Sequence, residues 1–336
     1  MIPPNAVAPL THGGDLDAAR RLFPGAPEPF LDLSTGINPH PYPIPPLPSE
    51  LFTRLPEPAD LARLICCAAA AYGAPSETNV VPAPGSQVLM TLIAGLVPPG
   101  RALVLGPTYA EHARAASLAG HEAVTVPDLE SLSHADLAIV VNPNNPDGRV
   151  LGRAELLAVA GRQRKHGGLL VVDEAFMEVG PRAESLVADA EAANVIVLRS
   201  FGKFFGLAGL RLSFALAPKV LAAQLRAGLG PWPLSGQALA IGALALSDQI
   251  WRQDTRQSLG KAARRLDRLL EGASLETIGG TSLFSLVRSD TAQRVFDRLG
   301  QAGIFVRRFD EQPDWLRFGL PGDEREWQRL EAALRG

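Results

Sequence analysis

The stretch Ser200-Phe201-Gly202-Lys203-Phe204-Phe205-Gly206-Leu207-Ala208-Gly209-Leu210-Arg211 comes just after an apolar run, Val195-Ile196-Val197-Leu198. Lys203 therefore stands between the predicted end of a buried strand and glycine-rich chain, with the Ser200 hydroxyl before it and the Arg211 guanidinium after it. A lysine in this position can form a Schiff base with an aldehyde cofactor, while the hydroxyl and the guanidinium hold a phosphate group. Taken alone, the stretch is more typical of an exposed loop. The rest of the chain must supply the other parts of such a site.

The composition is that of a globular protein with a large core. The chain has 336 residues, of which 46% are hydrophobic and 20% are charged, and its formal net charge is −3. This charge argues against nucleic-acid binding, and no apolar run reaches the roughly 18 residues that span a bilayer. The N-terminus lacks the features of a signal peptide. Cys66 and Cys67, adjacent on a predicted helix, favour buried thiols over a disulfide. We expect a cytoplasmic protein with no membrane or nucleic-acid partner, and the histidine spacing predicts no metal site.

Short apolar runs alternate with amphipathic stretches through the middle of the chain. Continuous apolar strands that alternate with helices predict a mainly parallel α/β sheet covered on both faces. The predicted strands are Val80-Val81, Ala102 to Leu105, Ala123 to Val126, Leu137 to Val141, Leu169 to Val172, Val195 to Leu198 and Leu212 to Ala215. The helices predicted between them include Gln87 to Leu96, Tyr109 to Leu118, Ala154 to His166 and Ser185 to Ala192.

The two ends of the chain predict a second, smaller α+β domain. After a helical stretch from Leu234 to Leu270, half-buried strands alternate with helices up to the C-terminus. The proline-rich residues before position 50 cannot form a central strand and read as an arm over this domain. We predict an arm over residues 1–45 that joins the small domain, a large domain over residues 46–225 and the small domain over residues 226–336.

Polar residues follow several of the predicted strands, at the sheet edge where such folds bind ligands. Gly85-Ser86-Gln87 opens a helix, whose free N–H groups make an anion site. Tyr109 can lie flat over a planar ring. The loop Asn142-Pro143-Asn144-Asn145-Pro146-Asp147-Gly148 offers side-chain amides. Asp173 ends a buried strand, where a carboxylate is costly unless it meets a cation such as a protonated pyridine nitrogen. Each feature alone has an ordinary structural alternative, such as a helix cap, a turn or core packing.

Other nucleotide or nucleophile motifs fail on their spacing. Gly202-Lys203 is not a phosphate-binding loop of the Gly-x4-Gly-Lys-Ser/Thr type, because position 197 is Val and position 204 is Phe. No Gly-x-Gly-x-x-Gly follows a strand, and no Gly-x-Ser-x-Gly elbow is present.

Taken in order, these strand-end motifs resemble those of the fold-type I pyridoxal phosphate enzymes. More narrowly, they resemble the class I and II aminotransferase group that contains the histidinol-phosphate aminotransferases, from about residue 30 to the C-terminus. The resemblance implies pyridoxal 5'-phosphate as the cofactor, with Lys203 as the Schiff-base lysine and proton carrier. It implies that Asp173 pairs with the pyridinium nitrogen, that Asn145 bonds the phenolic oxygen and that Tyr109 stacks on the ring. The phosphate is then bound by Gly85, Ser86, Gln87, Ser200 and Arg211.

Two positions depart from the family pattern. Many relatives have Tyr three residues after the aspartate, where this chain has Phe176. Histidinol-phosphate aminotransferases have Tyr before a Pro in an early motif, and this chain has Leu55 there. Both departures argue against a transaminase of that kind.

The arm resembles the opening of the threonine-phosphate decarboxylases of cobalamin biosynthesis. The resemblance rests on Thr11-His12-Gly13-Gly14 and on Leu31-Asp32-Leu33-Ser34-Thr35-Gly36-Ile37-Asn38-Pro39. It implies that His12, Gly13 and Asn38 face the substrate, that Arg307 helps to hold its phosphate and that Arg317 grips its carboxylate.

The leading hypothesis is therefore pyridoxal-phosphate-dependent decarboxylation of O-phospho-L-threonine to (R)-1-aminopropan-2-yl phosphate. Two alternatives stay open: transamination of histidinol phosphate or a related amino acid, and a regulator that binds the cofactor without turnover. The family implies a homodimer whose small-molecule substrate is a phosphorylated amino acid.

Overall fold

The computed structural model of the chain describes residues 12–335, so the first 11 residues of the predicted arm lie outside it. The described residues form two compact units. The first unit comprises residues 42–145 and 150–251, and the second comprises residues 12–41, 146–149 and 252–335. The chain therefore passes from one unit to the other after residues 41, 145, 149 and 251. The domain boundaries at residues 45 and 225, which rest on changes in sequence texture, stay predictions.

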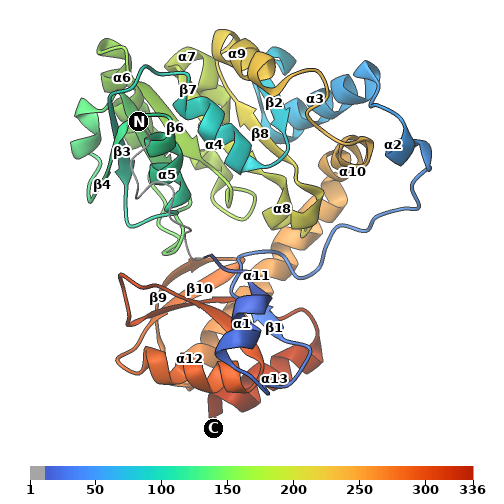
Figure 1. The fold of residues 1–336 in the computed structure, drawn as a ribbon, viewed down its shortest axis with the longest axis vertical. Helices are drawn as coiled ribbons and strands as arrows, with labels where there is room; N and C mark the ends of the chain where they lie inside the picture. Colours follow the sequence, from blue (N-terminus) through green and yellow to red (C-terminus); the bar gives the residue numbers. More distant parts are fainter. Residues whose placement is uncertain (1–11, 336) are drawn as a thin grey trace. The chain divides into compact units, whose positions relative to one another are not determined.

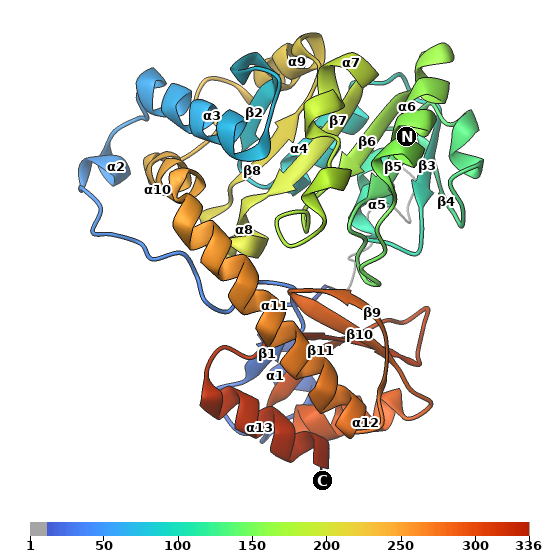
Figure 2. The same ribbon diagram turned by 180° about the vertical axis from the view of Figure 1, so that it is seen from behind.

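A seven-stranded sheet forms the centre of the first unit, in the order β2-β8-β7-β6-β5-β3-β4 (Figures 1 and 2). Adjacent strands from β4 to β7 are parallel, and β8 is antiparallel to both of its neighbours. β2 consequently runs in the same direction as β7. The strands are β2 (Val80–Ala83), β3 (Arg101–Leu105), β4 (Glu122–Val126), β5 (Leu137–Val141), β6 (Leu169–Asp173), β7 (Val195–Ser200) and β8 (Ser213–Leu216).

Helices cover both faces of this sheet, which confirms the predicted α/β architecture. Apolar residues of α4, α5 and α9 pack with alternate residues of the central strands in one core cluster, and Figure 2 shows α6 and α7 over the opposite face. Every residue of β5 and β6 is buried, as expected for strands covered on both sides. The helices of the unit are α2 (Glu50–Thr53), α3 (Pro58–Tyr72), α4 (Ser86–Ala94), α5 (Glu111–Leu118), α6 (Arg153–Lys165), α7 (Ala190–Ala193), α8 (Phe201–Phe204), α9 (Lys219–Leu229) and α10 (Gly236–Ser247).

The second unit is built on a five-stranded sheet in the order β1-β11-β12-β10-β9. β1 is parallel to β11, and the other neighbours are antiparallel. The long helix α11 (Gln249–Gly272) begins in the first unit and continues in the second. The remaining elements are α1 (Leu16–Leu22), β1 (Leu31–Leu33), β9 (Glu276–Thr281), β10 (Phe284–Arg288), α12 (Ala292–Gln301), β11 (Ile304–Arg308), β12 (Trp315–Gly319) and α13 (Glu324–Arg335).

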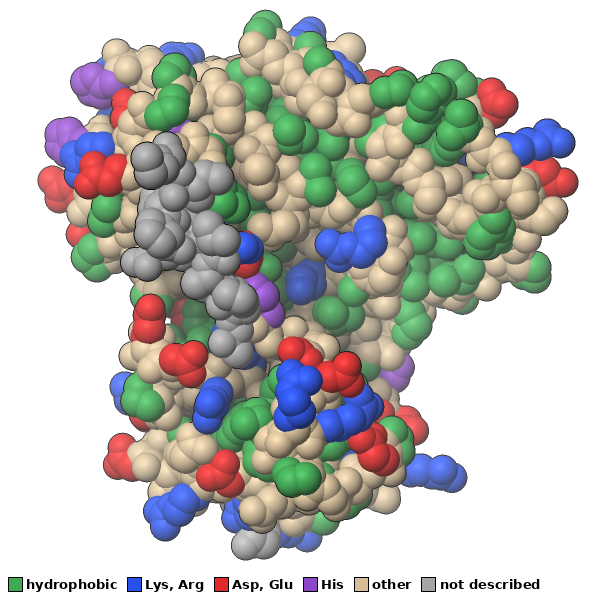
Figure 3. Space-filling model, viewed as in Figure 1, with side chains coloured by type: hydrophobic (Ala, Val, Ile, Leu, Met, Phe, Trp, Pro, Cys, Tyr) green, Lys and Arg blue, Asp and Glu red, His purple; other side chains and the backbone are tan. Residues whose placement is uncertain are grey.

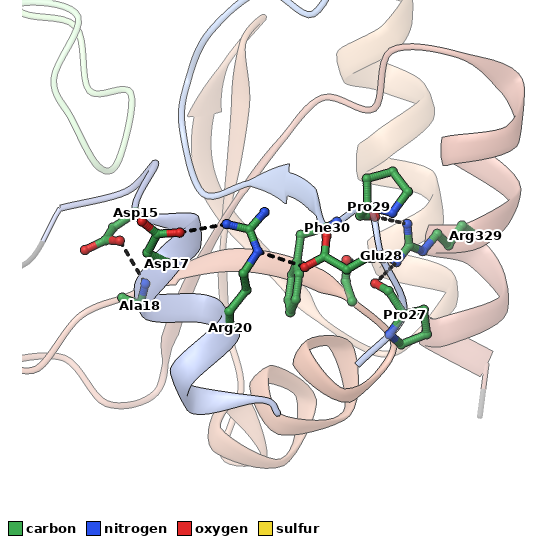
Figure 4. A network of polar contacts seen from close by, with 10 residues as sticks. Asp15, Asp17, Ala18, Arg20, Pro27, Glu28, Pro29, Phe30 and Arg329 are labelled. Atoms are coloured by element: carbon green, nitrogen blue, oxygen red, sulfur yellow. Dashed lines mark hydrogen bonds and ion pairs between the residues drawn. The ribbon is translucent and has the colours of Figure 1, made fainter. Parts of the chain in front are cut away.

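The N-terminal arm contains a short helix that the sequence analysis missed. α1 begins after Asp15, whose side chain accepts a hydrogen bond from the Ala18 N–H at 2.8 Å. From this helix Arg20 reaches Glu28 at 2.8 Å (Figure 4). This surface ion pair connects the helix to the chain that leads into β1.

Arg329 of α13 also binds the part of the arm around Glu28 (Figure 4). Its guanidinium donates to the carbonyl oxygens of Pro27 at 3.2 Å and Pro29 at 2.8 Å. It also donates to the carbonyls of Ala302 at 2.9 Å and Gly303 at 3.0 Å, in the turn before β11. One side chain thus holds the arm against the strand with which β1 pairs.

Two local predictions were wrong. The α-helix expected over residues 185–192 is replaced by a 3₁₀ turn, Val187–Asp189, and the short helix α7. It does not begin at Ser185, because the Ser185 hydroxyl and the Leu186 N–H bind the carboxylate of Glu174. Cys66 is exposed and Cys67 is half-buried, although both thiols are free as expected. Among the helices within residues 12–335, none has both the length and the apolar character to cross a bilayer.

Candidate active site

The cofactor-binding residues proposed from the sequence lie at one edge of the sheet of the first unit. Because β2, β3, β5, β6 and β7 run in the same direction, their carboxyl ends meet there, and β8 begins there. This is the edge at which sheets of this type bind ligands. The residues are Gly85, Ser86 and Gln87 after β2, Tyr109 after β3, Asn145 after β5, Asp173 ending β6, Ser200 ending β7, Lys203 in α8 and Arg211 before β8.

Asp173 is buried and held by two hydrogen bonds. His112 of α5 donates from Nε2 to Asp173 Oδ2 at 2.9 Å, and the Ala175 N–H donates to Oδ1 at 3.0 Å. The Tyr109 ring meets the His112 ring edge-on, with centroids 6.1 Å apart. The carboxylate is therefore fixed in orientation, as a partner for a cationic ring nitrogen must be. The sequence analysis missed His112. The available signal was its spacing of three residues from Tyr109, which places both side chains on one side of a helix start.

Gly85 and Arg211 form the part of the site suited to a phosphate. Gly85 precedes the first residue of α4 and has φ +97° and ψ 154°, a conformation that essentially only glycine adopts. A Cβ at this position would lie 2.6 Å from Arg211 Nη2, so the guanidinium lies directly against the Gly85 backbone. Ala83 pairs with Ser213, which pairs with Ser200, so the ends of β2 and β7 are two strands apart. A cation, a hydroxyl and the N–H groups of a helix start thus lie at the same edge of the sheet.

An aromatic stack fixes the short helix that carries Lys203. The Phe205 ring stacks on Phe201 with centroids 4.2 Å apart and on Trp251 with centroids 5.6 Å apart. A Cβ at Gly202 would lie 2.7 Å from the Cα of Ala208, so the chain doubles back closely behind the helix. Lys203, half-buried, projects from this rigid base. The glycines around Lys203 thus serve the fold as well as the site.

In the asparagine-rich loop after β5, two side-chain amides form hydrogen bonds with the backbone of neighbouring segments. Asn142 exchanges two hydrogen bonds with the backbone of Leu151, at 2.8 and 3.1 Å. Asn144 donates to the carbonyl of Pro107 at 2.9 Å, in the loop that carries Tyr109. Asn145 is the half-buried amide of the three. The two buried asparagines therefore shape the loop, and a ligand-binding role for Asn145 stays a prediction.

Glu174, whose partner the sequence could not supply, belongs to a buried ionic cluster behind the site. Its carboxylate accepts hydrogen bonds from Ser185 at 2.6 Å and from the Leu186 N–H at 2.7 Å. Arg199 Nε lies 3.2 Å from Glu174 Oε2, and Arg199 also faces Glu178 at 3.6 Å. Burial raises the pKa of Glu174, and this effect exceeds the opposing attraction of Arg199. The cluster fixes the chain directly after Asp173.

Asn145, which is also proposed to bind substrate, lies in the first unit, and the other proposed substrate-binding residues lie in the second. Arg307 of β11 and Arg317 of β12 are directly opposite each other in the antiparallel pair. Arg317 is buried and donates to the Ser34 carbonyl at 2.8 Å. Burial, followed by the nearby Arg307 charge, lowers the pKa of Arg317 to about 10, while Asp32 acts to raise it. Arg317 therefore keeps its positive charge at neutral pH.

The other proposed substrate residues lie in the arm of this unit. Asn38 is buried, and its Oδ1 accepts a hydrogen bond from the His40 N–H at 2.9 Å. Gly13 packs so closely that a Cβ would lie 2.3 Å from the Ser34 carbonyl oxygen. His12, next to it, is exposed. Within residues 12–335, no group of three or more His, Cys, Asp or Glu side chains is arranged to hold a metal ion.

The comparison with known families agrees with this fold and this strand-end pattern. The family model for aminotransferase class I and II matches residues 50–334. The chain therefore belongs to the class I and II aminotransferase family, which confirms the resemblance inferred from the motifs.

Individual relatives are similar over nearly the whole chain. A threonine-phosphate decarboxylase from a Sinorhizobium species is 45% identical over 97% of this chain and 98% of its own length. A threonine-phosphate decarboxylase from Pseudomonas aeruginosa is 44% identical over the same shares. Among solved structures, a histidinol-phosphate aminotransferase from Sinorhizobium meliloti in complex with pyridoxal-5'-phosphate superposes with a TM-score of 0.82, at 23% identity, over 99% of this chain and 96% of that one. This last likeness shows the fold.

The two departures from the family pattern have different surroundings. Phe176 is buried, three residues after Asp173. Leu55 lies after α2 and is 65% exposed. Neither side chain has a polar atom, so neither can donate the hydrogen bond that a tyrosine hydroxyl would.

Proposed function

We propose that the protein is a pyridoxal-phosphate-dependent carboxy-lyase that converts O-phospho-L-threonine to (R)-1-aminopropan-2-yl phosphate, a step of cobalamin biosynthesis. The observation that carries this proposal is the cross-strand pair Arg307 and Arg317 in the second unit. Like charges directly opposite each other destabilise a sheet. An anion offsets this cost, and a substrate with both a phosphate and a carboxylate offers one anionic group to each guanidinium.

The residues of the first unit fit the cofactor. A phosphate monoester suits the space against Gly85, where Arg211 and the start of α4 supply a cation and N–H donors. Asp173 suits a protonated ring nitrogen, because His112 and Ala175 occupy its oxygens from the protein side and keep it in one orientation. Tyr109 and Asn145 would face the ring, and Ser86, Gln87 and Ser200 would add donors to the phosphate.

When bound, pyridoxal phosphate accepts the electron pair of the bond that breaks at the substrate α-carbon. The chain's own residues supply the rest of the chemistry. Asp173 keeps the ring nitrogen protonated, Arg317 binds the substrate carboxylate and Arg307 binds its phosphate. Lys203 is the covalent anchor and afterwards delivers a proton to the α-carbon from which carbon dioxide has left. His12, Gly13 and Asn38 of the arm complete the contacts to the substrate.

The alternative is transamination of histidinol phosphate or a related amino acid. Histidinol phosphate has one anionic group, so it cannot offer a separate anionic group to each member of the arginine pair. The names of the two relatives that are 44–45% identical support decarboxylation over this alternative. Phe176 and Leu55 stand where the family pattern has tyrosine, and both differences argue against transamination of histidinol phosphate.

The test is to measure both reactions with one preparation. Purified protein with pyridoxal phosphate is given O-phospho-L-threonine, and released carbon dioxide is quantified alongside amino transfer to 2-oxoglutarate. We expect carbon dioxide release, with L-threonine a far poorer substrate because it lacks the phosphate. Amino transfer without carbon dioxide release would contradict the proposal. Absence of both reactions would favour a cofactor-binding regulator.

A Lys203→Ala variant tests the cofactor scheme itself. We expect it to lose both turnover and the yellow absorbance of the covalently attached cofactor. Lys219, at the start of α9, gives a matched control, since Lys219→Ala removes an exposed lysine of the same unit. Persistence of the absorbance in Lys203→Ala would assign the Schiff base to another lysine.

We also propose that the protein is a homodimer. Large hydrophobic side chains are exposed on the first unit, including Phe52 and Trp232. α2 adjoins the start of α10, because a Cβ at Gly236 would lie 2.7 Å from the Leu51 carbonyl oxygen. Figure 3 shows hydrophobic side chains gathered on this unit, whereas acidic and basic side chains are interspersed on the second. Light scattering of the wild type and of Phe52→Asp tests the proposal, with a dimer and a weakened dimer expected. The cytoplasmic location expected from the sequence stays a prediction.

A further inference from the structure

Ser34 and Asp32 lie next to residues that we propose to bind substrate, and Ser34 bonds to two parts of this site. We propose that these two residues are positioning residues, which hold the carboxylate-binding Arg317 and the His12–Gly14 turn in one fixed arrangement. The inference deepens the proposed function and rests on it.

Ser34 is fully buried, and all of its polar groups are bonded. Its N–H and its hydroxyl both donate to Asp32 Oδ1, at 2.9 and 2.6 Å. Its hydroxyl oxygen accepts the Gly14 N–H at 2.7 Å. Its carbonyl accepts from Arg317 Nη2 at 2.8 Å. A single residue therefore connects the turn that carries His12 to the guanidinium on β12.

Close packing allows the turn little freedom around this connection. A Cβ at Gly13 would lie 2.3 Å from the Ser34 carbonyl oxygen and 3.1 Å from its hydroxyl. A Cβ at Gly319 would lie 2.4 Å from the Thr35 carbonyl oxygen, where the arm passes β12. Both glycines let the arm lie directly against the backbone beside Arg317.

Asp32 adds charge to this geometry. Its carboxylate attracts the Arg317 guanidinium and opposes the effect of Arg307. Asp32 Oδ1 accepts both Ser34 bonds, so Asp32 fixes the residue whose carbonyl binds Arg317.

A buried polar network of this kind is not explained by stability alone. Replacing buried polar groups by apolar ones of similar shape is often neutral or stabilising. A network that is fully bonded does fix one arrangement of its members. In the Ser34 network the members include the arginine that binds the substrate carboxylate.

The experiment compares Ser34→Ala with a control that loses an equivalent bond elsewhere in the same unit. Ser285 is also buried, and its hydroxyl donates to Asp267 at 2.6 Å, so Ser285→Ala removes a Ser–Asp bond of the same length. We expect Ser34→Ala to raise the KM for O-phospho-L-threonine by about tenfold, with kcat changed less than about twofold, because one bonded group is lost and the reacting groups are intact. Ser285→Ala should leave KM unchanged.

Asp32→Asn and the double variant provide a second measurement that does not depend on Ser34→Ala folding normally. Because both side chains act through one hydrogen-bond chain, the double variant should raise KM no more than the larger single effect. A readout without turnover is the rise in Tm that O-phospho-L-threonine gives the cofactor-free protein, which should shrink in Ser34→Ala and not in Ser285→Ala.

The wild-type assay separates this inference from the proposed function. A wild type that releases no carbon dioxide overturns the proposed function. A wild type that turns over, with Ser34→Ala and Ser285→Ala equal in KM and in ligand-induced Tm shift, overturns the positioning role. Independent, additive effects of Ser34→Ala and Asp32→Asn on KM would overturn it as well.

Discussion

Replacing Gly85 by alanine should weaken cofactor binding at the phosphate site and also lower folding stability through backbone strain. The new methyl group would lie 2.6 Å from Arg211 Nη2, so the guanidinium must move away. Gly85 also has φ +97° and ψ 154°, which an alanine adopts only with strain. The substitution therefore has two effects, one on folding and one on the cofactor.

The two effects have different magnitudes and different assays. Strain at such a backbone position costs about 1–3 kcal/mol of folding stability, which urea denaturation measures. Loss of one hydrogen bond between Arg211 and a phosphate costs about 1.5–3 kcal/mol. That corresponds to an increase in Kd for pyridoxal phosphate of about 10- to 150-fold, which a titration followed by absorbance measures.

Gly230 provides the matched control. It has φ 78° and ψ −173°, and a Cβ there would meet no atom within 4 Å. Gly230→Ala should therefore lose stability to a similar extent and bind the cofactor like the wild type. Equal cofactor affinity of Gly85→Ala and Gly230→Ala would refute the assignment of Gly85 and Arg211 to the phosphate.

Two further substitutions test the groups that contact the site residues from the protein side. His112→Phe removes the donor to Asp173 Oδ2, so we expect kcat to fall by about tenfold or more. The control is His121→Phe, because His121 is also buried and bonds to the Ala94 carbonyl. An equal fall in kcat in His121→Phe would mean that the loss reflects general damage to the fold. Glu174→Gln tests the direction in which the pKa of a buried carboxyl moves. Because burial raises the pKa of Glu174 above 4.5 in the folded state, the stability that this group contributes is complete below pH 4.5 and is lost as the pH rises through the raised value. Glu174→Gln, neutral at every pH, should therefore gain stability relative to wild type in urea denaturation as the pH rises above 4.5. The gain is at most about 1.4 kcal/mol for every tenfold change in the acid dissociation constant of the carboxyl; a relative loss would mean that the ion pair with Arg199 dominates.

The sequence predicted those parts of the fold that depend on local patterns. The strands of the large sheet are continuous apolar runs, and the polar residues at their ends predicted a ligand-binding edge. The structure places Asp173, Lys203 and Arg211 at that edge, and their roles stay predictions. α1 was missed because its helix signal is a cap at Asp15 within a proline- and glycine-rich arm. The helix expected over residues 185–192 failed because a buried carboxylate from elsewhere in the chain takes its backbone donor.

Contacts between distant segments were beyond the reach of sequence patterns. The bond from His112 to Asp173 joins residues 61 positions apart, and the bond from Arg317 to Ser34 joins residues 283 positions apart. Periodicity predicts only which face of an element is buried, and does not identify the side chain that it contacts on the neighbouring element. The supporting residues of both sites therefore became visible only in the structure.

The fastening of the arm by Arg329 has a consequence for the order in which the protein assembles. Arg329 binds the carbonyls of Pro29 and Pro27, which precede it by 300 and 302 residues. At about 5–20 residues per second, a ribosome needs about 15–60 s to add that length of chain. All strands of the large sheet have been synthesised once Leu216 is added, whereas β1 pairs with β11 and Arg329 lies in α13. We therefore expect the large sheet to form first, and the arm that carries Ser34 and Asn38 to take its place only after the C-terminal helix has been made.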